Sequence, residues 1–551
     1  MKFSNKGALR EYTWGMLSRI LGLLFRSSRI QSLFLSYLAR ASALAHFRSA
    51  VPIVKIGFVL SLIAQILIGR RAALKIPVLS KAIIGTDSLI AMHNASTTNY
   101  INQVSRNRNE ECAFKNENFH WDEIIVGSGP GGSVAAYYSV QSGRRTLVIE
   151  AGNYQRKNIS HHSSEQLMES FAYGGQEVIL SQDIIPFAQG RVVGGGSEVN
   201  SGLYHRLPLH IKNQWIKDLE ISSEDWESEE FFVEDMLSIK KQSQVSLGLY
   251  DKSPLVLAAQ TQNWHCEVIP RWRTYSGDGM IHHGMESTFI NQAKAKGLII
   301  LPNHSVTNIF PHTNTVSIKI VGTNCSHHIK SKTLTLSAGT IETPKLLLKS
   351  NIIKANQIRM NFHAMSRLVA EYDYEVNNLH DIDPHQAWPS DYSVKFGAAV
   401  GTRELLAATL KSLQISENLE LQNLGVYYAS TVPSGKSGFL GSPARFTPYF
   451  MLNKLSKMQI RTNVKTLHRG LVASGAKRVF GDLENPPIST VHIFGSLPLI
   501  GSSIVNRRGF VLATNGRVRV CDASLLPTAP IVNPQGPVTH LSGVLSKETY
   551  S

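Results

Sequence analysis

The sequence predicts an α/β protein in which a doubly wound, Rossmann-like domain carries an inserted α+β lobe and follows an N-terminal helical extension. Three observations lead to this prediction. A strand, a glycine-rich turn, a helix and a second strand follow one another within residues 122–152. A second glycine cluster comes at 194–196. The 551 residues are 43% apolar and 17% charged, which is a globular composition with room for two or three domains.

The N-terminal extension, residues 1–91, is basic and apolar. The first 100 residues hold thirteen Lys or Arg and two acids, so they contribute +11 of the net charge of +16. On a helix, the arginines between residues 19 and 48 fall within an arc of roughly 100°, a pattern typical of a membrane-surface helix. Residues 51–69 are apolar with one charge, a length borderline for crossing a bilayer. Residues 12–69 are therefore expected to meet a membrane surface, to pack on the protein's own body, or to serve as a targeting segment.

Charge and cysteine content narrow the classes of partner and compartment. The chain beyond residue 100 is nearly balanced in charge, so no nucleic-acid partner is expected. The four cysteines lie far apart without the paired spacing of a zinc site or a disulfide framework, so no metal is expected. Such usage is typical of a reducing compartment. The expected location is cytoplasmic or membrane-associated, with organelle targeting left open.

The segment 122–152 has the order of a dinucleotide-binding unit. Gly127, Gly129 and Gly132 fit the G-x-G-x-x-G spacing between two short apolar strands. The first glycine permits the turn, the second lets backbone approach a pyrophosphate, and the third allows close packing of helix on strand. The helix N-terminus then presents N–H groups to phosphates. Glu150 ends the second strand, where a carboxylate can accept hydrogen bonds from ribose hydroxyls.

The second glycine cluster lies within "GRVVGGGSEVNSGLYHRLP", residues 190–208. Three consecutive glycines are costly to order because each loses much backbone entropy on folding. We interpret them as backbone lying flat against a planar ligand, with Asn200 placed to hydrogen-bond it. The alternative interpretation is a glycine-rich turn without a ligand.

This segment resembles the first signature of the glucose–methanol–choline (GMC) flavoprotein oxidoreductase family, departing from it at Leu207. "GTIETPKLLLKSNI", residues 339–352, is similar to the second signature, with Asn351 where a glycine is usual. The segment 284–309 resembles the part of the family that lies over the adenine, where Val306 would contact the cofactor through its backbone. The matches are spread over residues 120–551, so the family fold is implied for all but the extension.

The resemblance also implies the catalytic residues. His492 in "STVHIFGSLP" is similar to the family's His-x-x-Gly-Ser/Thr motif, and a histidine suits proton abstraction because its pKa lies near neutrality. "CDASLLPTAPIVNPQGP", residues 521–537, resembles the closing motif. There Asn533 takes the place of the second active-site residue, as in the cholesterol-oxidase and long-chain-alcohol-oxidase branches. Asparagine can donate to an alcohol oxygen but cannot act as a base, which favours His492 as the base.

The same resemblance implies FAD as cofactor. Asp522 would accept from the ribityl hydroxyls, and backbone N–H groups of residues 535–536 would stabilise negative charge on the reduced ring. The full set of expected cofactor-binding residues comprises Gly127, Gly129, Gly132, Glu150, Arg191, Gly195, Ser197, Asn200, Val306, Ala338, Gly339, Asp522, Ala523, Asn533 and Gln535.

The expected domain organisation is discontinuous. Residues 1–91 form the extension and 92–119, which are polar, form a linker. The FAD-binding domain is expected to combine 120–210, 285–355 and 490–551. The substrate lobe is expected to combine 211–284 and 356–489, with a strand near 367–376 and a helix beginning near 454.

The function implied is FAD-dependent oxidation of the CH–OH group of a small-molecule alcohol, with an apolar, sterol or long-chain substrate suggested by Asn533 and the N-terminal extension. The residues do not distinguish oxygen, a quinone or a protein as electron acceptor. Two alternatives stay open. One is a lyase or decarboxylase that keeps the flavin fold without net redox chemistry, and the other is a non-catalytic nucleotide-binding protein.

Overall fold

The computed structural model describes residues 120–551 except 157–162, 176, 183, 240–249, 251, 277–278, 313–315, 322–325, 380, 413–414, 416–418 and 442–445. The predicted extension (1–91), linker (92–119) and membrane contact through 12–69 lie outside the described residues. Within the part that is described, no helix has the length and apolar character needed to cross a bilayer. The α/β fold class predicted from the sequence is confirmed, since a largely parallel sheet flanked by helices forms one half of this region.

The first sheet has seven strands and follows the order β8-β2-β1-β11-β10-β9, with β21 added to the end of β11. Five strands are parallel neighbours, namely β8 (Ile299–Leu301), β2 (Thr146–Ile149), β1 (His120–Val126), β11 (Ser326–Leu336) and β21 (Val518–Val520). Antiparallel pairing adds β10 (Val316–Val321) and β9 (Ser305–Pro311). Strands far apart in the chain thus end at one edge, which is where parallel sheets bind ligands.

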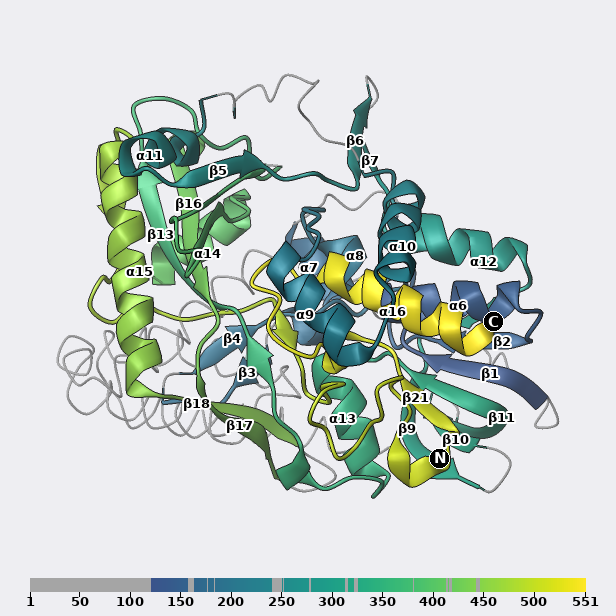
Figure 1. The fold of residues 1–551 in the computed structure, drawn as a ribbon. Helices are drawn as coiled ribbons and strands as arrows, with labels where there is room; N and C mark the ends of the chain where they lie inside the picture. The colour runs from purple at the N-terminus through teal and green to yellow at the C-terminus, as the bar shows by residue number, and fades with distance from the viewer. Residues whose placement is uncertain are drawn as a thin grey trace, which may run out of the picture. The chain divides into compact units, whose positions relative to one another are not determined.

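Two helices lie side by side against this sheet, as Figure 1 shows. Helix α6 (Pro130–Gln141) follows the first glycine turn and buries small residues such as Ala135 and Ala136 against the sheet. Helix α16 (Gln535–Tyr550) follows the closing motif and packs along α6. Small side chains on α6 permit close packing of this helix on the sheet, as the sequence predicted for the segment after the third glycine.

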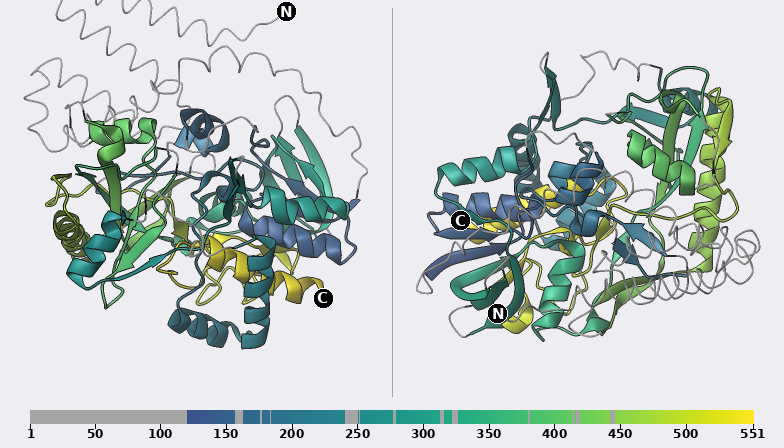
Figure 2. Two further views of the ribbon diagram at one scale, coloured as in Figure 1. Left: turned by 90° about the horizontal axis from the view of Figure 1, so that it is seen from above. Right: turned by 180° about the vertical axis from the view of Figure 1, so that it is seen from behind.

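The second sheet is antiparallel and has six strands in the order β19-β13-β16-β15-β14-β5. Their bounds are Arg478–Phe480, Ala364–Glu371, Leu424–Thr431, Lys395–Ala398, His385–Trp388 and His265–Val268. Helices α11 (Pro254–Gln262) and α15 (Lys454–Ala473) pack on the apolar face of this sheet, and the two views in Figure 2 show α15 along its outside. The strand predicted near 367–376 is confirmed over 367–371, since β13 begins three residues earlier and ends at Glu371, and the helix predicted from 454 is confirmed.

Shorter elements connect the sheets and complete the described region. They are α7 (Ser164–Ser170), η1 (Ala172–Gly175), β3 (Glu177–Ile179), β4 (Ile185–Phe187), α8 (Gly196–Val199), α9 (Leu209–Leu219), α10 (Ser223–Met236), β6 (Arg273–Ser276), β7 (Gly279–His282), η4 (Glu286–Ile290), α12 (Asn291–Ala295), α13 (Gly339–Lys349), η5 (Ala355–Gln357), β12 (Asn361–Phe362), α14 (Arg403–Ser412), η6 (Leu421–Asn423), β17 (Gly435–Leu440), β18 (Thr447–Leu452), β20 (Ile493–Phe494), η7 (Leu512–Thr514) and η8 (Ala523–Leu525).

The segments that build each sheet alternate along the chain. The seven-stranded sheet takes its strands from 120–149, 299–336 and 518–520, and the six-stranded sheet takes its strands from 265–268 and 364–480. The predicted domain boundaries stay a prediction, because the strands show which segments form each sheet but not where each domain begins and ends.

Candidate active site

The two glycine clusters contact each other at the edge of the seven-stranded sheet. A methyl group on Gly195 would lie 2.5 Å from the Cα of Gly129. At Gly127, where φ is +94°, a methyl group would lie 2.3 Å from the carbonyl oxygen of Ser337. Gly132 is equally constrained, at 2.1 Å from the carbonyl oxygen of Gly127. The turn therefore needs bare backbone at these positions, and a ligand there meets main-chain atoms.

The N-terminus of α6 fits a phosphate group. The helix begins at Pro130 after Gly129, and no side chain of the described residues caps it. Pro130 has no N–H, while the N–H groups of the next two residues belong to the first helical turn, which has no carbonyl partners within the helix. A negatively charged ligand satisfies such groups and interacts favourably with the helix dipole.

Glu150 is buried at the end of β2 and already accepts several hydrogen bonds. Its Oε2 accepts from the backbone N–H of Ser128 at 2.9 Å and from the Ser128 hydroxyl at 2.7 Å. Its Oε1 accepts from the N–H of Gly152 at 2.9 Å. Burial raises the pKa of this carboxyl, and these donors act against that shift. The carboxylate thus holds the glycine turn in shape, and its predicted contact with a ribose stays a prediction.

Asp522 has the same character at the end of β21. Its Oδ1 accepts from the N–H of Ser524 at 2.8 Å, and its Oδ2 accepts from the N–H of Gly339 at 2.9 Å. The Thr343 hydroxyl also donates to Oδ2, at 2.5 Å. These bonds join the closing motif to the start of α13, which is the second signature segment. The predicted contact with ribityl hydroxyls would use the lone pairs of the Asp522 carboxylate that these three hydrogen bonds leave available.

The first signature and the closing motif meet through an amide pair. Asn200 Nδ2 donates to Gln535 Oε1 at 2.5 Å, and Asn200 Oδ1 accepts from the N–H of Gly202 at 2.9 Å. Gln535 Nε2 is buried and has no hydrogen-bond partner among the described residues. No described side chain caps the N-terminus of α16, which begins at Gln535. A flavin carbonyl would satisfy donors of this kind, so these residues fit the predicted cofactor.

The remaining predicted cofactor-binding residues differ in how deeply they are buried. Ser197 is buried in α8, and its hydroxyl donates to the carbonyl of Gly194 at 2.9 Å. Ala338 directly precedes α13, and Ala523, which follows Asp522, begins η8. Val306 is half-buried in β9, paired with Ile320. Arg191 is exposed and donates to the carbonyl of Ala151 at 3.2 Å, so its side chain is outside the hydrogen-bond network just described.

His492 directly precedes β20 and is paired with a second histidine. Its Nδ1 lies 3.1 Å from Nδ1 of His363, and its carbonyl accepts from the N–H of His363 at 3.0 Å. Burial lowers the pKa of both histidines well below the usual range, and the positive charge of Lys395 adds to the effect. Both rings are therefore neutral near pH 7, and one Nδ1 must donate to the other.

Lys395 hydrogen-bonds Asn533 and acts on His492 through its charge. It is the first residue of β15, is 2% exposed, and its ammonium donates to Oδ1 of Asn533. Because a protonated lysine only donates, Asn533 turns its Oδ1 toward Lys395, and its NH₂ group has no hydrogen-bond partner among the described residues. Burial alone lowers the pKa of Lys395 to about 7. Lys395 thus hydrogen-bonds one of the two predicted catalytic residues and acts electrostatically on the other.

A further buried histidine is affected by the charge of Lys395. His205 Nε2 lies 2.9 Å from Gln386 Oε1, and Gln386 donates onward to the Tyr428 hydroxyl at 3.3 Å. Burial lowers the pKa of His205 to about 3, with a contribution from Lys395. Sequence reasoning did not single out these three residues: no motif includes Lys395 or His363, and His205 lies in the first signature segment without a role assigned to it. The available signal for Lys395 was a single charge inside the apolar run of residues 394–400.

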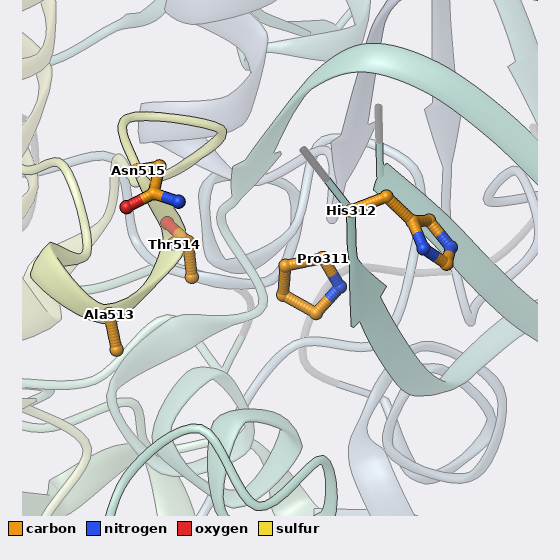
Figure 3. A pocket seen from close by; sticks show the side chains of 5 residues that line it. All are labelled: Pro311, His312, Ala513, Thr514 and Asn515. Atoms are coloured by element: carbon orange, nitrogen blue, oxygen red, sulfur yellow. The ribbon is translucent and has the colours of Figure 1, made fainter. Parts of the chain in front are cut away.

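A small polar pocket lies apart from these residues. It has a volume of about 350 Å³ and lies between the end of β9 and η7, lined by Pro311, His312, Ala513, Thr514 and Asn515 (Figure 3). None of the predicted catalytic or cofactor residues lines it. The described residues also contain no group of three or more His, Cys, Asp or Glu arranged to hold a metal ion. Cys266 and Cys521 are free thiols, while Cys112 and Cys325 lie outside the described residues.

The chain is similar in sequence to proteins of a known family. The GMC oxidoreductase family model matches residues 121–366. A GMC-type oxidoreductase of Sinorhizobium fredii is 23% identical over 495 residues, which cover 78% of this chain and 94% of that relative. The long-chain-alcohol oxidase FAO4B of Arabidopsis thaliana is 26% identical over 262 residues, covering 43% of this chain and 35% of that oxidase. (R)-mandelonitrile lyase 1 of Prunus dulcis is 24% identical over 259 residues, covering 42% of this chain and 44% of the lyase.

Among solved structures, the chain is similar to pyridoxine 4-oxidase from Mesorbium loti. The TM-score is 0.62 and the identity 15%, and the match covers 78% of this chain and 99% of the other. At this identity the likeness concerns the fold. The match extends the likeness in fold well beyond the residues of the family model.

Proposed function

Because the chain belongs to the GMC oxidoreductase family, we propose that it is an FAD-dependent enzyme that oxidises the CH–OH group of an alcohol to a carbonyl group. Two observations support this proposal most: His492 is neutral and precedes a segment that hydrogen-bonds to the segment after β21, and Lys395 orients the amide of Asn533. FAD, when bound, supplies the acceptor for the hydride that leaves the alcohol carbon. The residues of the chain must bind the alcohol, orient it and remove its hydroxyl proton.

We assign the role of proton acceptor to His492. Its neutral state near pH 7 leaves one ring nitrogen with a lone pair, which a general base requires. When His492 donates through Nδ1 to His363, its Nε2 is the nitrogen that accepts the hydroxyl proton. His363 then acts as a positioning residue, since its Nδ1 fixes both the ring orientation and the tautomer of His492.

Asn533 is assigned the role of holding the alcohol oxygen. The ammonium of Lys395 occupies its Oδ1, so the free NH₂ group is the part that can donate to the substrate. A donor at this oxygen stabilises the negative charge that develops as the proton leaves. Pro534 follows directly and restricts the backbone of Asn533 to an extended conformation, which limits where this amide points.

The bare backbone at Gly127, Gly129 and Gly195 and the uncapped start of α6 support binding of the FAD pyrophosphate. Gln535 Nε2, buried without a described partner, and the uncapped start of α16 support contact with the flavin ring. The long-chain-alcohol oxidases among the relatives keep a long-chain alcohol among the candidates. The polar groups around Asn533 favour a substrate that also offers polar contacts.

Anaerobic reduction tests this function. The purified holoenzyme is mixed with a panel of primary and secondary alcohols without oxygen, and the flavin absorbance band is recorded. We expect it to bleach with at least one alcohol and to recover on addition of dioxygen, a quinone or a protein acceptor, which identifies the acceptor. A flavin that stays oxidised with every alcohol while a cyanohydrin is cleaved would instead establish the lyase alternative.

Two histidine variants test whether His492 is the base. His492→Ala should bleach about 10²–10⁴-fold more slowly with its flavin content retained. His468→Ala, which removes a half-buried histidine from α15 on the outer side of the six-stranded sheet, should bleach at the wild-type rate. Full activity of His492→Ala would show that another group takes the proton.

A further inference from the structure

The six-stranded sheet has one apolar face and one polar, basic face. The apolar face packs on α11 and α15 through residues such as Leu368, Phe396 and Tyr427. Cross-strand pairing places Lys395 opposite Ser430, and Tyr428 opposite Arg367. Directly opposite residues share a face, so these side chains lie together on the other side of the sheet. We call this set the basic face, and it consists of Arg367, Gln386, Lys395, Tyr428 and Ser430.

The ammonium of Lys395 is under-satisfied at the centre of this face. It has three protons, and it donates to one described acceptor, Oδ1 of Asn533. It forms no ion pair with any residue that the structure describes, although it is 2% exposed. A charged group buried with one neutral partner costs several kcal/mol, so such a group either loses its proton or binds an anion.

Arg367 adds a second basic group without a described carboxylate partner. Its guanidinium donates to the Ser489 hydroxyl, and burial lowers its pKa. The acid farther along the same strand, Glu371, is paired with Arg478, with their side chains within salt-bridge distance. The acid that pairs with Gln386 across strands, Glu267, is on the edge strand and exposed. Within the described residues, the basic face therefore carries positive charge that no acid balances.

We propose that Lys395 is a specificity-determining residue, and that its buried amine binds a carboxylate or similar anionic group on the alcohol substrate. The inference rests on the proposed function, because it names a substrate class for the same site. An anion at this position would accept hydrogen bonds from the two ammonium N–H groups that have no described partner. It would also replace the missing counter-charge, which makes an acidic alcohol a better ligand here than a neutral one of equal size.

The groups that face Lys395 favour this interpretation. His205, His363 and His492 contribute no positive charge near pH 7, because burial lowers the pKa of each below neutrality. Burial raises the pKa of the Tyr428 hydroxyl, so it stays neutral as well. The positive charge of the basic face near pH 7 is thus set by Lys395 and Arg367. An anion also favours the charged form of Lys395, whose pKa in the free protein is about 7.

The contact with Asn533 limits the length of the substrate. Lys395 binds one end of the Asn533 amide, and the alcohol oxygen binds the other end in the proposed mechanism. The amine and the alcohol oxygen are then on the order of 7 Å apart, a span of two hydrogen bonds and one amide group. A few bonds between the carbinol carbon and the carboxylate match this span, which corresponds to short hydroxycarboxylates.

Matched pairs of alcohols test the proposal. Hydroxycarboxylates with spacers of increasing length are compared with their methyl esters, which keep the size and remove the charge. We expect the wild-type holoenzyme to show a higher kcat/KM for the acid than for its ester, with the largest ratio at short spacers. In Lys395→Met this ratio should fall about ten- to hundredfold, the worth of a hydrogen bond to a charged group. An unchanged ratio would overturn the proposal.

The pH profile gives a signature that a merely structural role would not produce. For the acids, kcat/KM of the wild type should fall above about pH 7 as Lys395 loses its proton, whereas for the esters this limb should be absent. Lys395→Arg keeps the charge at all these pH values, so it should retain the preference for acids and lose the alkaline limb. Lys212→Met, which removes an ion-paired lysine from α9, is the matched control and should keep the wild-type ratio and profile. An alkaline limb of equal size for acids and esters would contradict the assignment.

A binding measurement separates this inference from the proposed function. Alkanoates without a hydroxyl group cannot be oxidised, and titration calorimetry on the oxidised holoenzyme measures their Kd directly. We expect Kd to rise at least about tenfold in Lys395→Met. If alkanoates bind through Lys395 while no alcohol bleaches the flavin, the anion site stands and the proposed function fails. If alcohols bleach the flavin while acids have no advantage and alkanoates do not bind, the function stands and this inference fails.

Discussion

The two sheets of the protein bury charges of opposite sign and satisfy them to different degrees. At the seven-stranded sheet, Glu150 and Asp522 each accept three hydrogen bonds from the chain itself. At the six-stranded sheet, Lys395 has one described partner and Arg367 has no described acid beside it. A fully bonded carboxylate stabilises the turn around it, whereas an under-bonded ammonium costs free energy until a ligand arrives.

Under the proposed function, this difference separates the expected cofactor region, which the protein preorganises, from the expected substrate region, where buried positive charge has no described acid partner. Donors from Ser128 and Gly152 hold Glu150 in place, so the glycine turn has its shape before any nucleotide binds. The basic face, in contrast, keeps donor capacity free. The hydrogen bonds around Glu150 thus stabilise the region whose ligand is expected to be constant. The under-bonded charge of the basic face lowers stability in the region where the ligand is expected to determine specificity.

The largest effect is expected from a methyl group in the cofactor region. Gly127→Ala places a Cβ 2.3 Å from the carbonyl oxygen of Ser337, in addition to the cost of φ at +94°. Gly143, at the end of α6, has φ at +78° and open space around it, so Gly143→Ala isolates the backbone cost of about 1–2 kcal/mol. We expect Gly127→Ala to lose bound flavin, measured by absorbance of the purified protein, and Gly143→Ala to keep it. Equal flavin content in both variants would show that the turn adapts.

The next effect should have opposite signs in the two regions. Asp522→Ala leaves the N–H groups of Gly339 and Ser524 without their acceptor, so stability should fall by several kcal/mol, at about 1–3 kcal/mol for each buried group. Lys395→Met removes an under-bonded buried ammonium, so stability should rise by at least about 1 kcal/mol. Thermal melting of the flavin-saturated proteins measures both. A loss of stability in Lys395→Met would break the comparison.

The gain from Lys395→Met should depend on pH in a defined direction. The pKa of Lys395 is about 7 in the folded protein, against an ordinary value of 10.5. Below pH 7 the amine is charged in both the folded and unfolded states, so the burial penalty is fully present. Between pH 7 and 10.5 the unfolded state binds the proton that the folded state has lost, and wild-type stability rises with pH through this group. The advantage of Lys395→Met over wild type is therefore largest below pH 7 and shrinks above it.

The same contrast explains what could be predicted from the sequence. The α/β fold and strands β1 and β2 follow from short-range patterns, because a glycine turn between two apolar strands constrains its own geometry. The cofactor residues and His492 came from motifs in which spacing along the chain is fixed. Lys395, His363 and His205 come from three separate segments that tertiary packing brings together, and no local spacing connects them. The packing of β15 against the segment before α16, which places Lys395 beside Asn533, is a long-range property that the residues around 395 do not encode alone.

A smaller effect is expected from the histidine pair. His363→Phe keeps a ring of similar size beside Phe494, whose ring centroid is 5.0 Å away, but removes the partner of His492 Nδ1. Losing one neutral hydrogen bond that orients the base should lower kcat by about tenfold. His363→Asn can place an amide near the same position and should recover part of the rate. Stopped-flow bleaching measures both, and equal rates in the two variants would show that His363 has only a packing role.

The smallest effect should come from Asn351, at the position where the family usually has a glycine. Its φ is +56°, in the left-handed region that glycine adopts freely and that asparagine tolerates better than other residues. Asn351→Gly should therefore change stability by less than about 0.5 kcal/mol, whereas Asn351→Ala should cost about 1 kcal/mol. Melting temperatures of the two variants test this. The departure from the signature then changes one side chain and preserves the backbone conformation that ends α13. A large loss of stability in Asn351→Gly would instead mean that the asparagine side chain itself is required.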